Sequence, residues 1–467
     1  MILKELIRKV ASSSLIRPTL PTKRITPKRM KLDSPEFRSL FTPQLNTLSD
    51  LFKKNNYELR IAGGAVRDLL MGIRPADVDF ATTATPTEMK ELFEREQIRM
   101  LHKRGEEHGT ITCRIDDAEN FEITTLRIDL VCDGRRAEVQ YTTDWQLDAN
   151  RRDLTINSLF LDLDGNVVDY FGGVEDIEKR RVAFVGDAVQ RIQEDYLRIL
   201  RYFRFFGRIS SSNQHDSGTL KAIKDNSGGL AGISAERIWT ELKRIVVGRM
   251  ADEVIRCMIE ECKLQEYLGL PQNCNVNRFA RVFLKHNGGV EPMTMVASLC
   301  ETAEDIALFH KKTKLSNNER TLGEFIVTHR KEAERASSTS DLDWWKDMIV
   351  ELEVNPGHDN MKLSGLDLVV QLAKAVCADD SLIKELEAWT VPVFPVKGLD
   401  LMGAGVKNGP KMKLTLNYLF ELWRTSKYAM SKEQLLSHAL DDSIPEPAPP
   451  VRMPKKRRHQ ESPAKNV

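Results

Sequence analysis

The sequence predicts an α+β head followed by an all-helical (all-α) neck, body and tail. Over residues 57–170, short β-branched runs broken by Gly and Asp alternate with helical stretches. From Ala188 almost to residue 440, apolar residues recur at the 3.6-residue period of a helix. No apolar run reaches the length of about 18 residues that a membrane-spanning helix needs. We therefore expect a mixed α and β unit, then a helical part, and no membrane partner.

The expected elements of the head follow from these runs. We predict strands at residues 59–62, 78–82, 110–115, 121–126 and 159–163, and helices at residues 66–71 and 87–95. Residues 129–144, between two strands, are rich in charge and contain a Gly. We expect that segment to form a loop.

Composition limits the class of protein. The 467 residues are 41% hydrophobic and 29% charged, which is the balance of a globular protein rather than a disordered one. The seven Cys residues are an odd number and include no C-x-x-C pair. This pattern argues against a disulfide framework and a structural zinc site, and for a reducing compartment.

The net charge of +1 conceals an uneven distribution. Residues 1–31 carry nine Lys and Arg against one Glu, and residues 451–467 carry six against one. Subtracting these local charges of +8 and +5 leaves about −12 for the rest of the chain. Any polyanionic partner must therefore be held by a local cluster of basic residues, not by the overall charge.

Both termini differ in composition from the rest of the chain. Residues 1–30 combine spaced Arg and Lys with Leu, Ile and Ser and almost no acid, which is typical of a mitochondrial transit peptide or of a disordered basic arm. Met30 could serve as a second start that gives a cytoplasmic and nuclear form. Residues 441–467 are Pro-rich and basic, and we predict that they are disordered. Their KKRR cluster at 455–458 is a candidate nuclear-localisation signal, an RNA contact or a solvated tail.

An apolar strand that runs into Gly63 and Gly64, and then into a helix, is a candidate phosphate-binding turn. Paired glycines let the backbone approach a phosphate, and the N–H groups at a helix N-terminus can bind it. Arg67, in the first turn of that helix, can bind a phosphate through two parallel hydrogen bonds. A plain strand–turn–helix is the alternative.

Asp77 and Asp79 follow about ten residues later. We expect the two residues to lie two apart on one strand, so that their carboxylates leave the same face of the sheet and repel each other unless a cation lies between them. Mg²⁺ is the expected cation, because it takes carboxylate oxygens and leaves positions for substrate phosphates. A solvated acidic pair is the alternative, and the preceding Gly-Gly turn favours the metal site.

A row of charged residues marks the segment QEDYLRILRYFRFFGRI. Its members are spaced by three or four residues and are predicted to share one helical face; they are Asp195, Arg198, Arg201, Arg204 and Arg208. Neighbouring arginines repel each other by roughly 0.2–0.5 kcal/mol per pair unless an anion or an acid faces them. We expect a nucleoside triphosphate to face this row, and a solvated charged face is the alternative.

Five ordered motifs between residues 59 and 245 resemble those of the class II CCA tRNA nucleotidyltransferases, members of the polymerase-β-like superfamily. The motifs are GGAVRD (63–68) with DVD (77–79), RRDLTIN (151–157), DYFGG (169–173) with Asp176, EDYLR (194–198) and SAERI (234–238). Ser158 stands where this family usually has Ala. Together the five motifs are highly specific, although each alone is not.

The resemblance implies a polymerase-β-like nucleotidyltransferase head and assigns roles to the candidate residues. Asp77 and Asp79 are expected to be catalytic and to hold Mg²⁺, and Glu122 to be a third catalytic carboxylate that orients the primer 3′-hydroxyl, unless it points to solvent. Asp195 and Arg198 are expected to read the base edge of CTP or ATP, because C and A share an amino group beside a ring acceptor. The other expected nucleotide-binding residues are Gly64, Arg67, Arg152, Arg201 and Arg204. A salt bridge to Asp148 or Asp153 is the alternative for Arg152.

The implied function is template-independent addition of CCA to the 3′ end of tRNA from CTP and ATP, with release of pyrophosphate. A poly(A) polymerase of the same superfamily and a catalytically inactive RNA-binding homologue are the alternatives. We expect a transit peptide at 1–30, a head at 31–185, a neck at 186–290, a tRNA-binding body and tail at 291–440, and a disordered tail at 441–467. The expected assembly is a monomer or a homodimer.

Overall fold

The chain forms two compact units in the computed structural model, which describes residues 24–101, 106, 109–132, 137–354 and 363–446. The first unit contains the described residues up to Ser337 together with Val370–Asp379, and the second contains Ser338–Val369 and the described residues from Asp380 onward. The expected divisions at 185/186, 290/291 and 440/441 stay predictions. Most of the expected transit peptide and most of the expected C-terminal tail lie outside the described residues.

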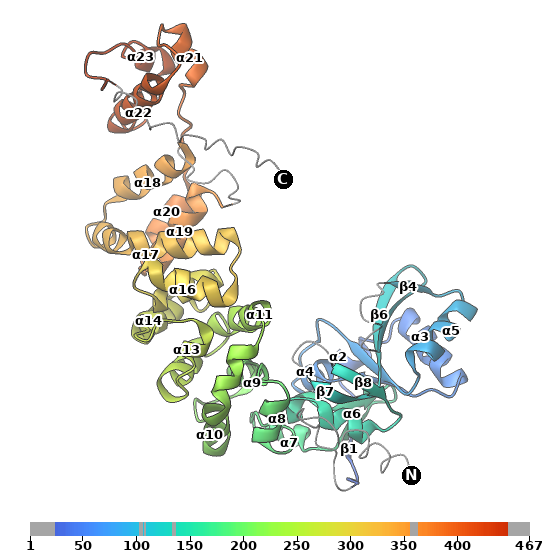
Figure 1. Cartoon of the computed structure of the whole chain (residues 1–467). Helices are drawn as coiled ribbons and strands as arrows, with labels where there is room; N and C mark the ends of the chain where they lie inside the picture. Colours follow the sequence, from blue (N-terminus) through green and yellow to red (C-terminus); the bar gives the residue numbers. More distant parts are fainter. Residues whose placement is uncertain (1–23, 102–105, 107–108, 133–136, 355–362, 447–467) are drawn as a thin grey trace, which may run out of the picture. The chain divides into compact units, whose positions relative to one another are not determined.

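A mixed sheet of eight strands forms the centre of the head (Figure 1). The strand order is β1-β10-β9-β2-β3-β6-β5-β4. Central β3 and β6 run parallel, and the other neighbouring pairs are antiparallel. The strands are β1 (Lys28–Lys31), β2 (Leu59–Ala62), β3 (Asp79–Thr82), β4 (Arg99–Leu101), β5 (Thr110–Ile115), β6 (Glu119–Thr125), β9 (Phe160–Asp162) and β10 (Asn166–Asp169).

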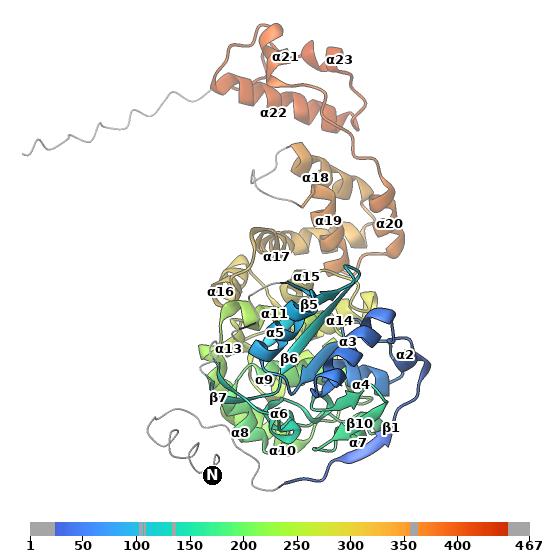
Figure 2. The ribbon, with the colours of Figure 1, turned by 90° about the vertical axis from the view of Figure 1, so that its right-hand side faces the viewer.

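Among the described residues of the head, six α-helices and the 3₁₀ helix η3 accompany the sheets. They are α2 (Pro35–Arg38), α3 (Pro43–Lys54), α4 (Gly64–Leu70), α5 (Pro86–Arg95), α6 (Trp145–Arg151), α7 (Gly173–Glu178) and the 3₁₀ helix η3 (Thr155–Asn157). Helices α3 and α5 each begin with a Thr cap followed by Pro, which satisfies free N–H groups of the first turn. Both pack against the β4–β5 end of the sheet (Figure 1 and Figure 2).

The strands and helices predicted for the head are all present, and their ends agree within two residues. The prediction of a loop at residues 129–144 is wrong. Strands β7 (Arg127–Cys132) and β8 (Ala137–Tyr141) pair there as an antiparallel two-stranded sheet. The apolar residues of the second strand alternate with polar ones, and this period of two decides the structure despite the high charge.

Strand β1 was not predicted, because the first strand was expected near Leu59. Its sequence KRMK has no strand signal, and all four residues are exposed, as suits a charged edge strand. It pairs antiparallel with β10, with Met30 opposite Val167. Before it, the Ile25 N–H donates to Gln146 Oε1 at 3.0 Å. The folded head therefore begins before Met30.

The rest of the first unit is helical, as predicted from Ala188 onward. Helix α9 packs against α11 and α12, with its aromatic residues buried and its arginines on the remaining face. The helices are α8 (Ala188–Glu194), α9 (Arg198–Ile209), α10 (Ser217–Asn226), η4 (Ser227–Gly232), α11 (Ala235–Val246), α12 (Ala251–Arg256), the π-helix η5 (Cys257–Glu261), α13 (Gln265–Leu268), α14 (Val276–His286), α15 (Pro292–Leu299), α16 (Ala303–Thr313) and α17 (Asn317–Ser338).

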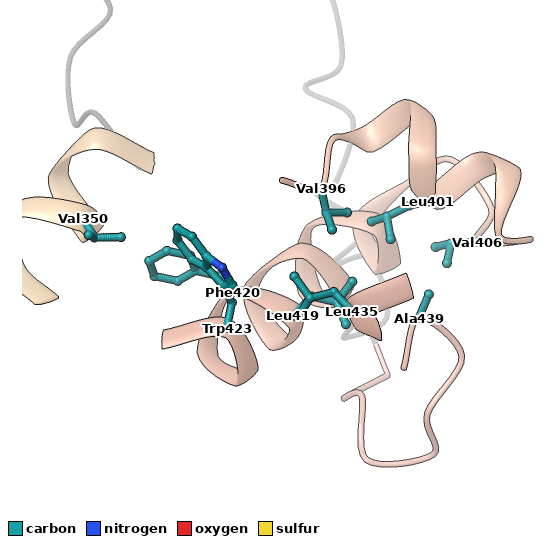
Figure 3. Packing of buried hydrophobic residues seen from close by; sticks show 9 residues of the cluster. All are labelled: Val350, Val396, Leu401, Val406, Leu419, Phe420, Trp423, Leu435 and Ala439. Atoms are coloured by element: carbon teal, nitrogen blue, oxygen red, sulfur yellow. The ribbon is translucent and has the colours of Figure 1, made fainter. Parts of the chain in front are cut away.

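The second unit is also helical and has its own core. Its helices are α18 (Leu342–Val354), α20 (Asp380–Ala388), α21 (Gly398–Gly403), α22 (Pro410–Thr425) and α23 (Lys432–Leu436); α19 (Gly365–Ala375) begins in this unit and ends in the first. Buried residues of α22, among them Leu419, Phe420 and Trp423, form the centre of that core (Figure 3). Among the described helices of the whole chain, none combines the length and apolar character that crossing a bilayer needs.

Candidate active site

A cavity of about 550 Å³ lies in the first unit, between the head sheet and the start of the neck. Its walls contain all seven residues predicted to bind the nucleotide and two of the three predicted catalytic carboxylates: Gly64, Arg67, Arg152, Asp195, Arg198, Arg201, Arg204, Asp79 and Glu122. Residues far apart in the sequence therefore meet in one cavity, which we treat as the candidate active site.

The turn between β2 and α4 requires its first glycine. Gly63 has φ of 67°, which side chains disfavour, and a Cβ atom there would lie 2.8 Å from Arg152 Nη1. The Gly63 N–H donates to the Leu159 carbonyl at 3.0 Å, which ties the turn to the residue before β9. The glycines thus bring the backbone and the start of α4 to the cavity wall.

The parallel pairing of β3 and β6 brings two carboxylates together. Asp79 opens β3 and stands in register with Glu122 on β6, so both side chains leave the same face of the sheet on strands about 4.8 Å apart. Burial, together with the charge of Asp77, raises the pKa of Asp79, although Arg152 opposes this. Burial and then the charges of Asp79 and Asp77 raise the pKa of Glu122.

The expectation that Asp77 lies on the same strand as Asp79 is wrong. Asp77 lies in a bend two residues before β3 begins, and it is exposed. Its negative charge is nevertheless among the causes that raise the pKa of Asp79 and of Glu122. Asp77 therefore lies close enough to act on the other two carboxylates.

These carboxylates fit a divalent cation. Neighbouring negative charge raises the pKa of both Asp79 and Glu122, and such a concentration of negative charge favours a nearby cation. In the part of the chain that the structure describes, no group of three or more His, Cys, Asp or Glu side chains is placed so that it could hold a metal ion. A small carboxylate set suits Mg²⁺, which keeps several waters and takes substrate phosphates as its other ligands.

Carboxylates of the protein itself face the arginine row of α9. An acid facing the row is one of the two ways to offset its repulsion that the sequence left open, and the expected nucleoside triphosphate opposite the row stays a prediction. All four arginines line the cavity. The ion pairs are Arg198 with Glu194 (2.6 Å), Arg201 with Asp153 (2.6 Å), Arg204 with Glu241 (2.7 Å) and Arg208 with Asp68 (2.9 Å).

These ion pairs keep the buried charges in place. Burial alone would raise the pKa of Asp153, but the guanidinium of Arg201 outweighs it and holds that pKa below its ordinary value. Burial lowers the pKa of Arg204 to about 10, which still leaves it charged at neutral pH. The charged side chains of the cavity wall are therefore paired and already oriented before a ligand binds.

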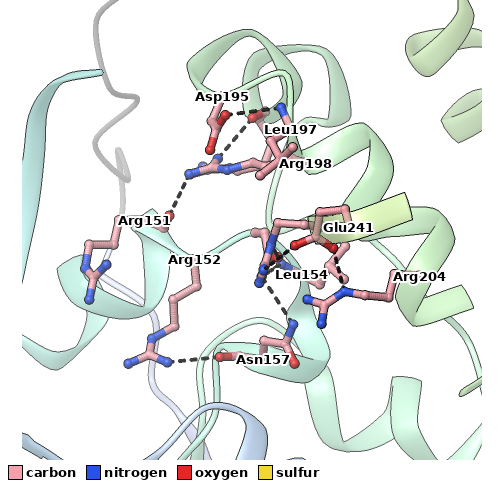
Figure 4. Close-up of polar contacts among 12 residues, drawn as sticks. Arg151, Arg152, Leu154, Asn157, Asp195, Leu197, Arg198, Arg204 and Glu241 are labelled. Carbon is pink, nitrogen blue, oxygen red and sulfur yellow. Dashed lines mark hydrogen bonds and ion pairs between the residues drawn. The ribbon is translucent and has the colours of Figure 1, made fainter. Parts of the chain in front are cut away.

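Asp195 was expected to lie on the helix of the arginine row, but it lies outside that helix. It caps the C-terminus of α8 with extended backbone angles (φ −156°, ψ 105°). Its Oδ1 accepts from the Leu197 N–H at 3.1 Å. Arg198 opens α9 and donates from Nη2 to the Arg151 carbonyl at 3.0 Å (Figure 4). Its Nη1 donates to Glu194. Asp195 and Arg198 still line the same cavity.

Arg152 and Arg67 are both anchored by protein groups. Arg152 donates from Nη1 to the Asn157 carbonyl (Figure 4). It also donates from Nε and Nη2 to Asp148, so the predicted alternative of a salt bridge to Asp148 is present. Arg67 is 3% exposed and donates to Asp68 and to Asn157 Oδ1. Contacts of either arginine with a nucleotide stay predictions.

Sequence reasoning does not single out the acids that hold the arginines, notably Asp68 and Glu241. Glu241 is 5% exposed and lies four residues after Arg237 on α11, so both share one face of that helix. In the sequence SAERIWTEL, the spacing of four residues between Arg237 and Glu241 is the signal that could have identified Glu241. Asp68, the last residue of GGAVRD, has no such signal.

Replacing Glu241 by Gln is expected to destabilise the first unit by about 3 kcal/mol, because it removes the buried carboxylate that neutralises the partly buried guanidinium of Arg204. Urea unfolding followed by circular dichroism measures this change. Glu260→Gln, which removes an exposed ion pair with Arg256, is the matched control and should change stability by under about 1 kcal/mol. Equal stability of the two variants would contradict the role of Glu241.

Two families of known proteins match the first unit. The family described as "Poly A polymerase head domain" matches residues 59–183. The family described as "Probable RNA and SrmB- binding site of polymerase A" matches residues 216–269. The first match includes Gly64, Asp79, Glu122 and Arg152, which line the cavity.

A human (Homo sapiens) relative decides the family. It is named "CCA tRNA nucleotidyltransferase 1, mitochondrial" and is 50% identical over 412 residues, which are 88% of this chain and 92% of the relative. The chain belongs to the CCA tRNA nucleotidyltransferase family. Members of this family are enzymes, and a match over almost the whole length does not favour the alternative of a poly(A) polymerase.

Solved structures of CCA-adding enzymes share the fold of this CCA tRNA nucleotidyltransferase family member. The Bacillus stearothermophilus enzyme in complex with CTP has a TM-score of 0.65 and 23% identity, covering 87% of this chain and 97% of that one. The Thermotoga maritima enzyme complexed with tRNA has a TM-score of 0.62 and 17% identity, covering 90% and 99%. The predicted fold class, a polymerase-β-like head followed by a helical part, is confirmed.

Proposed function

We propose that this chain adds CCA to the 3′ end of tRNA, taking two C residues from CTP and then one A from ATP and releasing pyrophosphate. The observation that carries this proposal is one cavity that joins a carboxylate pair, Asp79 and Glu122, to the base-reading candidates Asp195 and Arg198. Protein side chains then select the base, and no nucleic-acid template is needed. The family membership supports the same activity.

In the proposed chemistry, the tRNA 3′-hydroxyl oxygen attacks the α-phosphate of the bound nucleotide. A new O–P bond forms, the bond from the α-phosphorus to the oxygen that bridges it to the β-phosphate breaks, the hydroxyl proton passes to solvent, and pyrophosphate leaves. Asp77 and Asp79 would hold Mg²⁺, which lowers the pKa of the 3′-hydroxyl and neutralises phosphate charge when it is bound. Glu122, beside Asp79, orients the hydroxyl.

The rest of the cavity would bind the nucleotide. Gly64 at the start of α4, with Arg67 and Arg152, faces the triphosphate. Arg201 and Arg204 add positive charge along the α9 wall. Asp195 accepts from the exocyclic amino group of C or A, and Arg198 donates to the ring acceptor beside it. U and G present a carbonyl at that place and would leave Asp195 unpaired, which disfavours them.

We also propose that the helical body and tail, residues 291–440, bind the tRNA. The structure of the Thermotoga maritima relative, which is complexed with tRNA, has the same fold over 90% of this chain and supports this role. An inactive RNA-binding protein is disfavoured, because closely spaced carboxylates whose pKa values are raised by burial and repulsion would serve no purpose in a binder.

The test of the proposed function is an extension assay. Purified protein, Mg²⁺ and α-labelled CTP or ATP are incubated with a tRNA that lacks its 3′ CCA. CTP alone should add two residues, ATP should then add one, and extension should stop at three. A long A tract would indicate a poly(A) polymerase, and binding of tRNA without labelling would indicate an inactive homologue.

We propose that the full-length form enters mitochondria and that a form starting at Met30 serves the cytoplasm and nucleus. The human relative, named as mitochondrial, and the basic composition of residues 1–30 support the first part. Residues 1–23, the larger part of that segment, lie outside the described residues. Localisation of tagged full-length and Met1→Ala chains tests the proposal, and a mitochondrial signal from the Met30 form alone would contradict it.

A chain that starts at Met30 is expected to melt roughly 2–4 °C below one that starts at Arg24, because it lacks half of strand β1 and the hydrogen bond of Ile25 to Gln146. Its cavity residues are all retained, so its activity at 25 °C should be unchanged. Thermal unfolding of both chains checks the expectation, and identical melting temperatures would show that residues 24–29 do not stabilise the head.

A further inference from the structure

Helix α11 places two charged side chains against the residues proposed to choose the base. Arg237 Nη2 donates to Asp195 Oδ2 at 2.6 Å. Glu241, one turn further along the helix, pairs with Arg204 on α9. Because residues four apart lie on one helical face, α11 presents a cation to Asp195 and an anion to the arginine row.

The carboxylate of Asp195 is fixed at both oxygens. The Leu197 N–H holds Oδ1 and the guanidinium of Arg237 holds Oδ2. Each carboxylate oxygen can accept more than one hydrogen bond, so both remain able to accept from a ligand. The bond from Arg237 is charge-assisted and is roughly twice as strong as a neutral one, so it is the main constraint on the carboxylate.

The backbone around Asp195 is held in place by packing rather than by a helix. Asp195 has extended backbone angles between α8 and α9. The ring of Tyr196 lies against Gly229, where a Cβ atom would come within 2.0 Å of it. With the backbone fixed in this way, the remaining freedom is rotation of the Asp195 side chain, which the Leu197 N–H and, more strongly, Arg237 restrict.

We propose that Arg237 is a positioning residue that sets the choice of base. It holds the Asp195 carboxylate in the direction from which it accepts the exocyclic amino group of C or A. Without it, the carboxylate can turn away and no longer disfavours the carbonyl of U or G. This inference rests on the proposed function, in which Asp195 reads the base.

The test compares kcat/KM for the four nucleotides on a tRNA that lacks only part of its CCA end. In Arg237→Ala, incorporation of U and G relative to C and A is expected to rise about tenfold. Arg237→Lys keeps the charge and should restore most of the selectivity. Arg256→Ala removes an arginine–carboxylate pair outside the cavity and should leave selectivity as in wild type.

The outcomes separate this inference from the proposed function. If wild type does not add CCA, the proposed function fails. If wild type adds CCA and Asp195→Ala relaxes selectivity while Arg237→Ala does not, the inference about Arg237 is wrong. Equal slowing with all four nucleotides, or a lower KM for CTP and ATP at unchanged selectivity, would also overturn it.

If Arg237→Ala does not fold, Arg237→Gln is the second variant, because it keeps a hydrogen-bond donor without the charge. It should show an intermediate loss of selectivity, and wild-type selectivity in this variant would contradict the inference.

Discussion

Asp79→Asn is expected to lower the rate of nucleotide addition by about 10³-fold or more, with tRNA binding close to wild type. Asp79 lies in the cavity beside Glu122, and both pKa values are raised by burial and by the negative charges around them. Neutralising Asp79 removes the carboxylate charge that would hold Mg²⁺ against the triphosphate, while the fold keeps an amide of the same size. Asp77→Asn is expected to have an effect of the same order, because the two carboxylates are proposed to share the metal.

Single-turnover extension of tRNA lacking CCA measures the rate, and filter binding measures affinity for tRNA. Asp164→Asn is the matched control, because that exposed aspartate lies in the turn between β9 and β10 and outside the cavity. Turnover close to wild type in either Asp77→Asn or Asp79→Asn would show that the metal assignment is wrong.

Asp195→Ala and Arg198→Ala are expected to relax discrimination against UTP and GTP by about 10-fold to 100-fold and to slow addition of C and A. Each variant loses a hydrogen bond to a charged group in which only C and A can take part. Arg198→Ala should also lower stability, because its guanidinium donates to the Arg191 and Arg151 carbonyls and to Glu194.

Selectivity is measured as the ratio of kcat/KM for UTP or GTP to that for CTP or ATP. Asp225→Ala, which removes an exposed ion pair on α10, is the control for the loss of a carboxylate. If both variants slow all four nucleotides equally and keep the ratio, Asp195 and Arg198 do not read the base, and the arginine row binds phosphates only.

Much of the head could be predicted because local sequence signals decide it. Strands β2 and β5 agree with the prediction at both ends, since apolar, β-branched residues stand between turn residues. Strand β1 could not be predicted, because KRMK carries no β signal and its strand conformation depends on β10, more than a hundred residues away. The antiparallel pair β7 and β8 was missed because the segment is rich in charge. Charge favours a loop only where no alternation of apolar and polar residues opposes it.

The sequence could predict which residues belong to the candidate site, but not the ion pairs that connect them. The motifs indicate that Arg201 and Arg204 belong near Asp79, and one cavity contains all three. The four acids that neutralise the arginines come from three helices, α4, α8 and α11, and from the bend at Asp153, and their positions follow from tertiary packing, which a helical spacing cannot show. The same reason explains Asp195, whose extended backbone breaks the helix that the spacing alone predicts.

The central claim is that protein side chains alone choose the sequence CCA. The most direct test is to incubate the wild-type protein and Mg²⁺ with tRNA lacking its 3′ end and an equimolar mixture of all four nucleoside triphosphates, and then to sequence the tRNA 3′ ends. Our account predicts that the extended ends read CCA and stop there, and that Asp195→Ala adds U or G at the same positions. Ends that contain all four bases in wild type, or that continue as an A tract, would contradict it.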